Sequence, residues 1–427
     1  GGAVMGLVTG VVGTGLAVQP AIERGLLKLS EAQALEFETA AKTHFNLWAS
    51  RAEWCDVAAE LDFYALQSLA FLSQLESGDV FGLLPQVARG GPVGLAVQLV
   101  EADRICNPSG KPDTLDWTAG LGRDADGRTA RVAIARAHPG TPGNVWDERA
   151  VWGEHTGLRQ VLHVHDVLRP GQRRGMPYLA PVIEPLKQLG TYTDAEIMAA
   201  VVSGMFTVFI TSEDADSAAA ATAKPGAVDD IALEAGGVFQ LGPNEKIETA
   251  NPGRPNAAFD PFVQAIVRQI AMRLEQPYEV LLKHYTSSYT AARAAFLDAY
   301  RVWRRRRATL AAQFCQPVYE GVLYELVASG RLRAPGFLRD PLTRAAYCRA
   351  DWIADAHGAL NPVHEANAAA LRIDTGMTTL EEETIAYSGR SWSDVHAQRV
   401  REVAARRAGG LQESLAAPAV TDPDKED

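Results

Sequence analysis

The sequence predicts an α+β fold in which helices flank a β-rich insert. Between about residues 79 and 165, short alternating apolar runs are separated by Gly, Pro, Asn and Asp, which is typical of β-hairpins. On both sides of that insert, apolar residues recur at helical spacing. Helices therefore do not alternate with strands along the chain, and a doubly wound parallel sheet is not expected.

The composition indicates a folded, acidic protein. Of the 427 residues, 47% are hydrophobic and 22% are charged, so the chain can bury a substantial core. The formal net charge of −11 argues against gripping nucleic acid over the whole surface, although loose contact with sliding DNA stays open. The cysteines are scattered without C-x-x-C spacing, which predicts buried free thiols: Cys55, Cys106, Cys315 and Cys348.

The N-terminal run GGAVMGLVTGVVGTGLAVQP is apolar but does not fit a signal peptide or a membrane span. It has no basic residues before its apolar part, and its glycines weaken a spanning helix. We therefore expect no association with a membrane. Because the sequence begins without Met, we also expect that it starts inside a longer product.

The first predicted region, residues 1–78, is helical. Ser30 and Gln33 form a capping box that begins a helix over SEAQALEFETAAKTHFNLWAS. A second helix is predicted over residues 55–77, ending at Gly78. The β-rich region follows as residues 79–177.

Residues 178–285 are predicted to combine helices, a loop and a small β element. The first helix is expected to be interrupted near Pro185 and Gly190. Residues 212–236 are of low complexity, and we expect a loop that becomes ordered only in an assembly. Residues 237–250 are a strand–turn–strand candidate.

Three further helical features are predicted in the rest of the chain. Asp260 at the N-cap and Pro261 at the first helical position begin a helix. Residues 286–335 hold one helix of about 40 residues, roughly 60 Å long, which Pro317 interrupts and Gly330 ends. Residues 336–427 carry three shorter helices, beginning near Asn361, near Thr379 and at SWSDVHAQ, before a frayed polar tail.

Enzyme motifs are consistently missing from the sequence. No P-loop occurs, HEANA at residues 364–368 has Ala368 where a zincin needs its second His, and the N-terminal GVVGTGLA has the wrong spacing for a dinucleotide site. One cluster still has metal-ligand chemistry: His163 and His165 lie on one face of a predicted strand, with Asp166 next to them. A zinc-dependent hydrolase centred on these three residues is the alternative hypothesis, against structural histidines beside a loop.

A run of arginines lies in the predicted long helix: Arg301, Arg304, Arg305, Arg306 and Arg307. Such runs usually form a solvated, salt-bridged helix surface. The functional interpretation is contact with DNA phosphates or ion pairs between subunits. The sequence leaves both open.

The stretch HVHDVLRPGQRRGMPYLAPVIEPLKQLGTYTDAEI closely resembles the signature of lambda-family bacteriophage portal proteins. Weaker matches follow in order along essentially the whole chain: VVGTGLAVQP, LQSLAFLSQLESGDVFGLL, QPYEVLLKHYTSSYTAARAAFLDAYRVWRRRR and NPVHEANAAALRIDTGMTTLEEETIAYSGRSWSDVHAQRVRE. The departures are Asp79 for the usual Glu, Thr290 and Ala291 for a Ser pair, Asn361 for Asp and His364 for Lys. None of these departures replaces a catalytic residue, since the resemblance implies a family without a catalytic site.

The resemblance implies a structural protein without enzyme activity or cofactor. Its members form twelve-subunit rings with wing, stem, clip and crown regions at one capsid vertex. Double-stranded DNA enters through the ring, driven by terminase, and leaves into the tail; the major capsid protein and head–tail adaptor proteins are the other partners. The implied location is the virion, after assembly in the bacterial host cytoplasm. A prophage or gene-transfer particle would use the same fold.

The resemblance also assigns the predicted regions. Residues 1–78 and 79–177 would form the wing, residues 178–285 the stem and clip, and residues 336–427 a helical crown. The family-signature corner consists of Arg169, Pro170, Gly171, Arg174, Gly175 and Pro177. There Gly frees the backbone, Pro fixes it, and the arginines are available to pair with neighbours, so we expect a structural strand-to-helix corner.

Overall fold

A computed structural model describes residues 2–204, 208–212, 245–249, 259–285, 288–356, 358 and 361–411. The chain divides into two compact units. The smaller unit comprises residues 181–283, and the larger unit contains the rest. Among the described residues, none of the helices combines the length and the apolar character that crossing a membrane requires.

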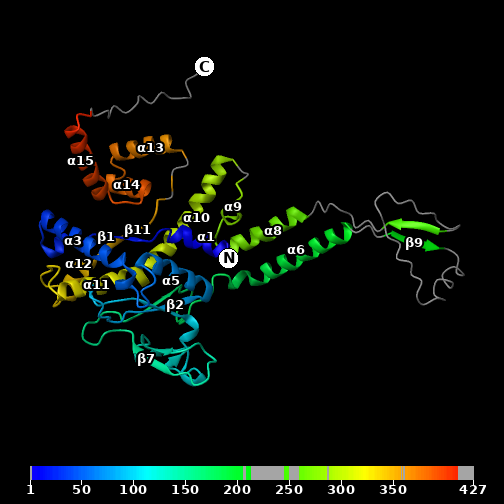
Figure 1. Cartoon of the computed structure of the whole chain (residues 1–427), viewed down its shortest axis with the longest axis horizontal. Coiled ribbons are helices and arrows are strands. Elements are labelled where there is room, and N and C mark those ends of the chain that lie inside the picture. The colour runs from blue at the N-terminus through cyan, green and yellow to red at the C-terminus, as the bar shows by residue number, and fades with distance from the viewer. Residues whose placement is uncertain are drawn as a thin grey trace, which may run out of the picture. The chain divides into compact units, whose positions relative to one another are not determined.

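The larger unit has a helical part and a β part (Figure 1). Its helices are α1 (Gly2–Val11), α2 (Arg24–Leu27), α3 (Glu31–Ala49), α4 (Ala52–Cys55), α5 (Phe63–Ser77), α10 (Tyr289–Leu310), α11 (Gln316–Ala328), α12 (Pro341–Cys348), α13 (Pro362–Asp374), α14 (Leu380–Ser388) and α15 (Trp392–Ala408). Its strands are β1 (Ala17–Pro20), β2 (Asp79–Leu83), β3 (Gln98–Glu101), β4 (Trp117–Thr118), β5 (Leu121–Arg123), β6 (Thr129–Ala135), β7 (Trp146–Ala150), β8 (Val161–His165) and β11 (Ala350–Ile353).

The main core joins segments from both ends of the chain. Phe45 of α3 meets Tyr319 of α11 edge to face, with ring centroids 5.3 Å apart. Phe63 of α5 stacks on Phe314 at 5.7 Å. All four rings are fully buried. Because α3 and α5 pack against residues some 250 positions later, the N-terminal helices depend on the C-terminal half of the chain for their core.

The β part consists of two antiparallel sheets, as the hairpin pattern predicts. One has the order β3-β2-β8 and the other β4-β5-β6-β7. Strand β2 is covered on both faces: Val80 belongs to the main core, and Phe81 to a second core with residues of the other sheet. Since successive side chains of a strand point to opposite faces, Asp79 lies on the same face as Phe81. Asp79 is paired across the sheet with His165.

A short two-stranded sheet pairs β1 with β11. The VVGTGLAVQP motif provides β1, and Thr14 in the same motif donates both its backbone N–H and its hydroxyl to the Asp355 carboxylate, at 2.7 and 2.5 Å. The sequence did not predict this pairing, because four-residue strands more than 300 residues apart leave no local signal.

The capping-box and C-terminal helix predictions are confirmed. The Ser30–Gln33 box begins α3, and Asn361, Thr379 and Ser391 cap α13, α14 and α15. The helix predicted over residues 55–77 is wrong at its start, since α5 begins at Phe63. The Asp56 carboxylate accepts three backbone N–H groups, from Ala58, Glu60 and Leu61, and this holds the segment in a turn.

The long helix over residues 286–335 is confirmed in extent, from Tyr289 to Ala328, with Gly330 at φ +72° beyond its end. Its interruption differs from the prediction. A π-helical turn at Ala311–Cys315 lies just before Pro317, and the backbone stays helical through both. A wider turn leaves room for the proline ring, which would otherwise clash with a carbonyl of the preceding turn, so the helix continues past Pro317.

The smaller unit contains α6 (Ile183–Gly204), β9 (Val208–Ser212), β10 (Glu245–Thr249), α8 (Phe259–Arg273) and α9 (Tyr278–Leu282). In Figure 1, α6 and α8 lie side by side. The predicted interruption near Pro185 and Gly190 is wrong, because α6 is continuous. Pro185 lies in its first turn, where an N–H has no helical partner to lose.

Two other predictions concern the smaller unit. Helix α8 already includes Phe259, so Asp260 and Pro261 lie in its first turn and not at the cap. Strand β10 pairs with β9, and the first strand of the strand–turn–strand candidate, before Glu245, lies outside the described residues. The loop predicted over residues 212–236 falls almost entirely outside the described residues.

Candidate functional site

The family-signature corner connects β8 to residue Tyr178 and is held by its own polar groups. Gly171 has φ +76°, a left-handed conformation that favours glycine. The Gln172 side chain accepts from the Leu168 N–H at 2.8 Å and donates to the carbonyls of Asp166 and Arg174, at 3.2 and 2.9 Å. Gln172 thus fixes the loop from inside, a role that the sequence did not indicate.

Arg174 is the centre of the corner. Its Nε and Nη2 bind the two oxygens of Asp79 at 2.6 and 3.0 Å. Its remaining hydrogens reach three backbone carbonyls, those of Ala102, Ile105 and Ala119, at 2.8 to 3.0 Å. All five N–H groups of the guanidinium are therefore used. We call the Asp79–Arg174 pair and these carbonyls the clamp.

Two glycines bring the corner against the start of β2. Gly78 has φ +93°, and a Cβ added to Gly175 would overlap the Gly78 carbonyl. The Gly175 N–H also donates to Asp79 at 3.1 Å, and the Tyr178 N–H donates to the Leu75 carbonyl at 2.9 Å. The glycines are required here because two backbones touch.

The clamp sets the charge of Asp79, whose side chain is only 2% exposed. Burial by itself would raise its pKa, but hydrogen bonds from His163 and Arg174 outweigh burial and hold the pKa far below its usual range. Burial lowers the pKa of His163, so neutral His163 donates from Nε2 to Asp79 at 3.0 Å. Asp79 is thus a buried anion with one cationic and one neutral partner.

The structure brings His163 and His165 together but not as a pair of metal ligands. Their rings stack at 3.9 Å with 13° between the planes. Because imidazole nitrogens bind a metal in the plane of the ring, stacked rings cannot both point at one ion. Asp166 binds Arg306 Nη1 at 3.2 Å instead. The three residues of the zinc-hydrolase alternative therefore do not converge.

A cavity of about 250 Å³ lies beside these histidines, lined also by Gln313, Trp152 and Arg159. Gln313, on the π-helical turn, accepts from the backbone N–H of His165 at 2.8 Å. Burial lowers the pKa of His165 to about 4. Arg159 stacks on Trp152 at 4.7 Å. Among the described residues, no group of three or more His, Cys, Asp or Glu is placed to hold a metal ion.

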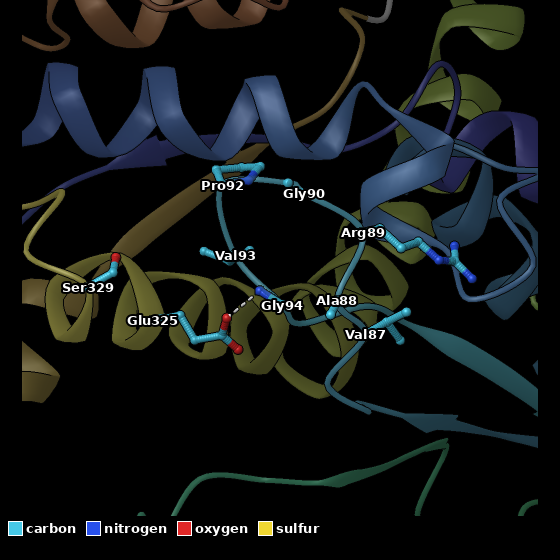
Figure 2. Close-up of a pocket in the computed structure, with 10 residues that line it drawn as sticks. Val87, Ala88, Arg89, Gly90, Pro92, Val93, Gly94, Glu325 and Ser329 are labelled. Carbon is cyan, nitrogen blue, oxygen red and sulfur yellow. Dashed lines mark hydrogen bonds between the residues drawn. The ribbon is translucent and has the colours of Figure 1, made fainter.

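A second cavity, of about 260 Å³, lies between residues 87–94 and α11 (Figure 2). Its two charged side chains have structural partners. Glu325 accepts from the backbone N–H groups of Gly94 and Leu95 at 2.7 and 3.3 Å. Arg89 extends away from Glu325 in Figure 2 and donates to backbone carbonyls, including that of Asp56 at 2.8 Å. Both anchor the loop.

The remaining corner residues are less constrained. Arg169 and Pro170 are exposed, and Pro177 is half-buried where the chain leaves the corner. Arg173 donates to the Gly127 carbonyl at 2.9 Å. Of the predicted corner residues, only Arg174 belongs to the clamp, and the Gly175 N–H donates to the same carboxylate. Their partner Asp79 was noted in the sequence only as a departure from Glu.

The arginine run on α10 divides into two groups. Arg306 binds Asp166 and stacks on Tyr178 at 4.8 Å, and Arg307 donates to the Gly10 and Val11 carbonyls at the end of α1. These two side chains bind within the subunit. Arg301, Arg304 and Arg305 are exposed.

A family model and two curated relatives all match this chain to the same family. A family model described as phage portal protein, lambda family, matches residues 1–307. The chain is 27% identical over 343 residues to portal protein B of Escherichia phage lambda and 26% identical over 340 residues to the portal protein of Escherichia phage N15. Each match covers 74% of this chain and 63% of the relative, so the chain spans less than two thirds of their length.

Solved structures similar to this one include a chain from the neck of a native GTA particle computed with C12 symmetry. That chain has a TM-score of 0.43 and 12% identity, with 81% of this chain and 89% of that chain covered. A chain from the virion of the native gene transfer agent particle has a TM-score of 0.41 and 13% identity, with 90% and 92% covered.

Proposed function

Because this chain belongs to the lambda family of phage portal proteins, we propose that it forms the ring at one vertex of a phage capsid. Twelve copies would surround a channel through which terminase packages double-stranded DNA and through which the genome is later ejected. The same ring would attach the capsid protein on one side and head–tail adaptor proteins on the other. The family match over residues 1–307 carries this proposal.

The corner geometry supports a structural role. Its charged and polar groups bind one another and nearby backbone, so the described corner presents no nucleophile held next to a base. A clamp of this kind holds the strand-to-helix junction in one geometry, which a subunit needs when the same contact is repeated around a ring.

The charge of the chain supports contact with DNA that is weak and independent of sequence. A subunit with a net charge of −11 does not bind the DNA polyanion tightly over its whole surface. A few arginines in each copy, repeated around the ring, are enough to line a channel. Arg301, Arg304 and Arg305 are the residues that we propose for DNA or inter-subunit contact. Arg306 and Arg307 would support them from within the subunit.

We also propose the assignment of the regions to parts of the ring. Residues 1–177 would form the wing, residues 178–285 the stem and clip, and residues 336–427 the crown. Within the long helix over residues 286–335, the part near residues 290–316 would contribute to the stem or to packing between subunits.

Electron microscopy and mass photometry of the purified chain test the proposal together. We expect rings with a central hole and a mass of about 550 kDa, twelve times the 45.9 kDa subunit. Adding the chain to a packaging reaction that lacks its own portal should restore protection of DNA from nuclease. A protein that stays monomeric at all concentrations, or rings that never support DNA protection, would contradict the proposal.

A further inference from the structure

The C-terminal helices α13, α14 and α15 lack a core of their own. In Figure 1 they form a separate group of three, and α14 contacts α15. None of their 39 residues is buried, whereas the 19-residue helix α3 buries six. Helices of a folded domain normally bury one apolar stripe. These three helices therefore leave their side chains accessible to a further protein segment.

The exposed apolar residues lie at helical spacing. On α13, Val363 and Leu371 are eight residues apart and 62% and 65% exposed. On α14, Leu380 and Tyr387 are seven residues apart, and on α15 Trp392 and Val400, 36% and 55% exposed, are eight residues apart. Residues spaced by four, seven or eight share a helix face. Each helix thus presents an apolar face to solvent.

The group is attached to the rest of its unit mainly by polar contacts. Lys42 binds Asp394 at 2.6 Å, and Ser391, the N-cap of α15, is buried beside it. A Cβ on Gly389 would crowd the backbone of residues 354–356, so the chain passes closely there. These contacts fix the position of the group without covering its apolar faces.

Charge indicates what covers these faces. Helices α13 and α14 together carry five acidic residues and one arginine, whereas α15 carries four arginines and two acidic residues. On α13, Asp374 lies on the face of Val363 and Leu371, whereas the four arginines make α15 the basic helix of the group. One copy therefore offers an acidic apolar face and a basic apolar face that complement each other.

We propose that the α13 face of one copy packs against the α15 face of the next copy around the ring. Two different faces in contact give a head-to-tail interface, which closes into a ring when the rotation permits. This inference rests on the proposed ring and adds the surfaces that join its subunits at the C-terminal helices.

Cysteine cross-linking of the full chain tests the contact. A Leu371→Cys/Val400→Cys double variant, treated with a short bismaleimide, should give a ladder of covalent oligomers up to the full ring. Each single variant should give none. The matched control is Leu371→Cys/Glu402→Cys, since Glu402 is exposed on the opposite side of α15 from Val400. Wild-type protein reports any background from the half-buried Cys106.

Serine substitutions provide a second measurement. Leu371→Ser and Val400→Ser should leave the far-ultraviolet circular dichroism unchanged, because both side chains are exposed in the subunit. Each should raise the protein concentration needed for half-assembly by about tenfold or more, as expected for lost apolar burial.

The outcomes separate this inference from the proposed function. Rings seen by electron microscopy without a ladder from the double variant would overturn the inference and leave the ring proposal standing. A covalent dimer without longer products would also overturn it, since a two-fold contact gives only dimers. Preparations without any rings would overturn the proposed function itself.

Discussion

At Asp79, a carboxylate that water cannot reach is balanced by one guanidinium and one neutral imidazole. Buried ion pairs contribute to stability only when every donor and acceptor is used, because both charges lose their hydration. Here that condition is met: Arg174 uses all five N–H groups, and Asp79 also accepts from His163 and Gly175. The clamp is therefore sensitive to loss of either partner.

We predict that Asp79→Asn lowers the free energy of unfolding by about 3–5 kcal/mol, because it leaves the Arg174 charge without its counterion. Arg174→Lys should be similarly harmful, since an ammonium cannot reach all the acceptors. Urea unfolding of the purified subunit measures both. Arg169→Lys, at an exposed position of the same corner, is the control and should change stability little.

The histidines make stability depend on pH. Burial lowers the folded-state pKa of His165 to about 4, below its unfolded value of about 6.5. Between these values the unfolded chain binds the proton first, so stability falls as the pH drops from about 6.5 to 4. His163 acts in the same direction, and the low pKa of Asp79 extends the loss below pH 4.

His165→Gln should therefore flatten the dependence of the urea midpoint on pH between 6.5 and 4. Wild-type protein measured across the same range provides the reference slope. An identical slope in the variant would mean that His165 is not the titrating group.

At the corner, the sequence predicted the conformation of single residues but not their distant partners. Gly171 was expected to free the backbone and does so, with φ +76°, whereas Gly175 is required for a different reason, the close approach of the Gly78 carbonyl. The partner of Arg174 was not predicted, because Asp79 lies 95 residues earlier and only the fold brings the two together. The same limit applies to the histidines: spacing placed them on one face, but their stacking depends on β2.

Helix boundaries were predicted correctly where the residues that set them are close in sequence. They were predicted wrongly where one residue could form either of two local structures. The capping boxes of α3 and α14 involve residues three positions apart, so the sequence contains the whole interaction. Residues 55–62 look helical, but Asp56 offers their N–H groups a stronger local alternative. Pro185 shows the converse, since its position within the first turn decides whether it interrupts α6.

On helix α10, Arg306 and Arg307 bind other groups of the same subunit, and Arg304 and Arg305 are exposed. We predict that Arg304→Glu/Arg305→Glu impairs ring assembly or the DNA content of particles, because both charges are exposed. Arg331→Glu/Arg333→Glu changes the net charge equally at two exposed positions after α11, and should assemble normally.

Electron microscopy and nuclease-protected DNA measure the outcome. Rings of normal abundance, filled with DNA as in the wild type, would refute a role for Arg304 and Arg305. Conversely, loss of assembly in the Arg331/Arg333 control would point to a general effect of net charge.

For the whole molecule, the sequence predicted the α+β class and its order of helical and β-rich regions. It also located the family resemblance that the comparisons confirm. The division into two units, and the cores shared between distant segments, depend on packing that no local pattern reports. The absence of buried residues in α13–α15 is of the same kind, because those helices have ordinary N-caps that do not reveal it.

The pairing of β1 with β11 has a consequence for biosynthesis. Strand β1 leaves the ribosome early, but its partner at Ala350–Ile353 is translated some 330 residues later. At bacterial elongation rates this is a delay of roughly 17 to 66 s. Throughout it, the apolar N-terminal segments lack their final neighbours, which gives chaperones time to bind. Strand β1 therefore reaches its final pairing only when translation is nearly complete.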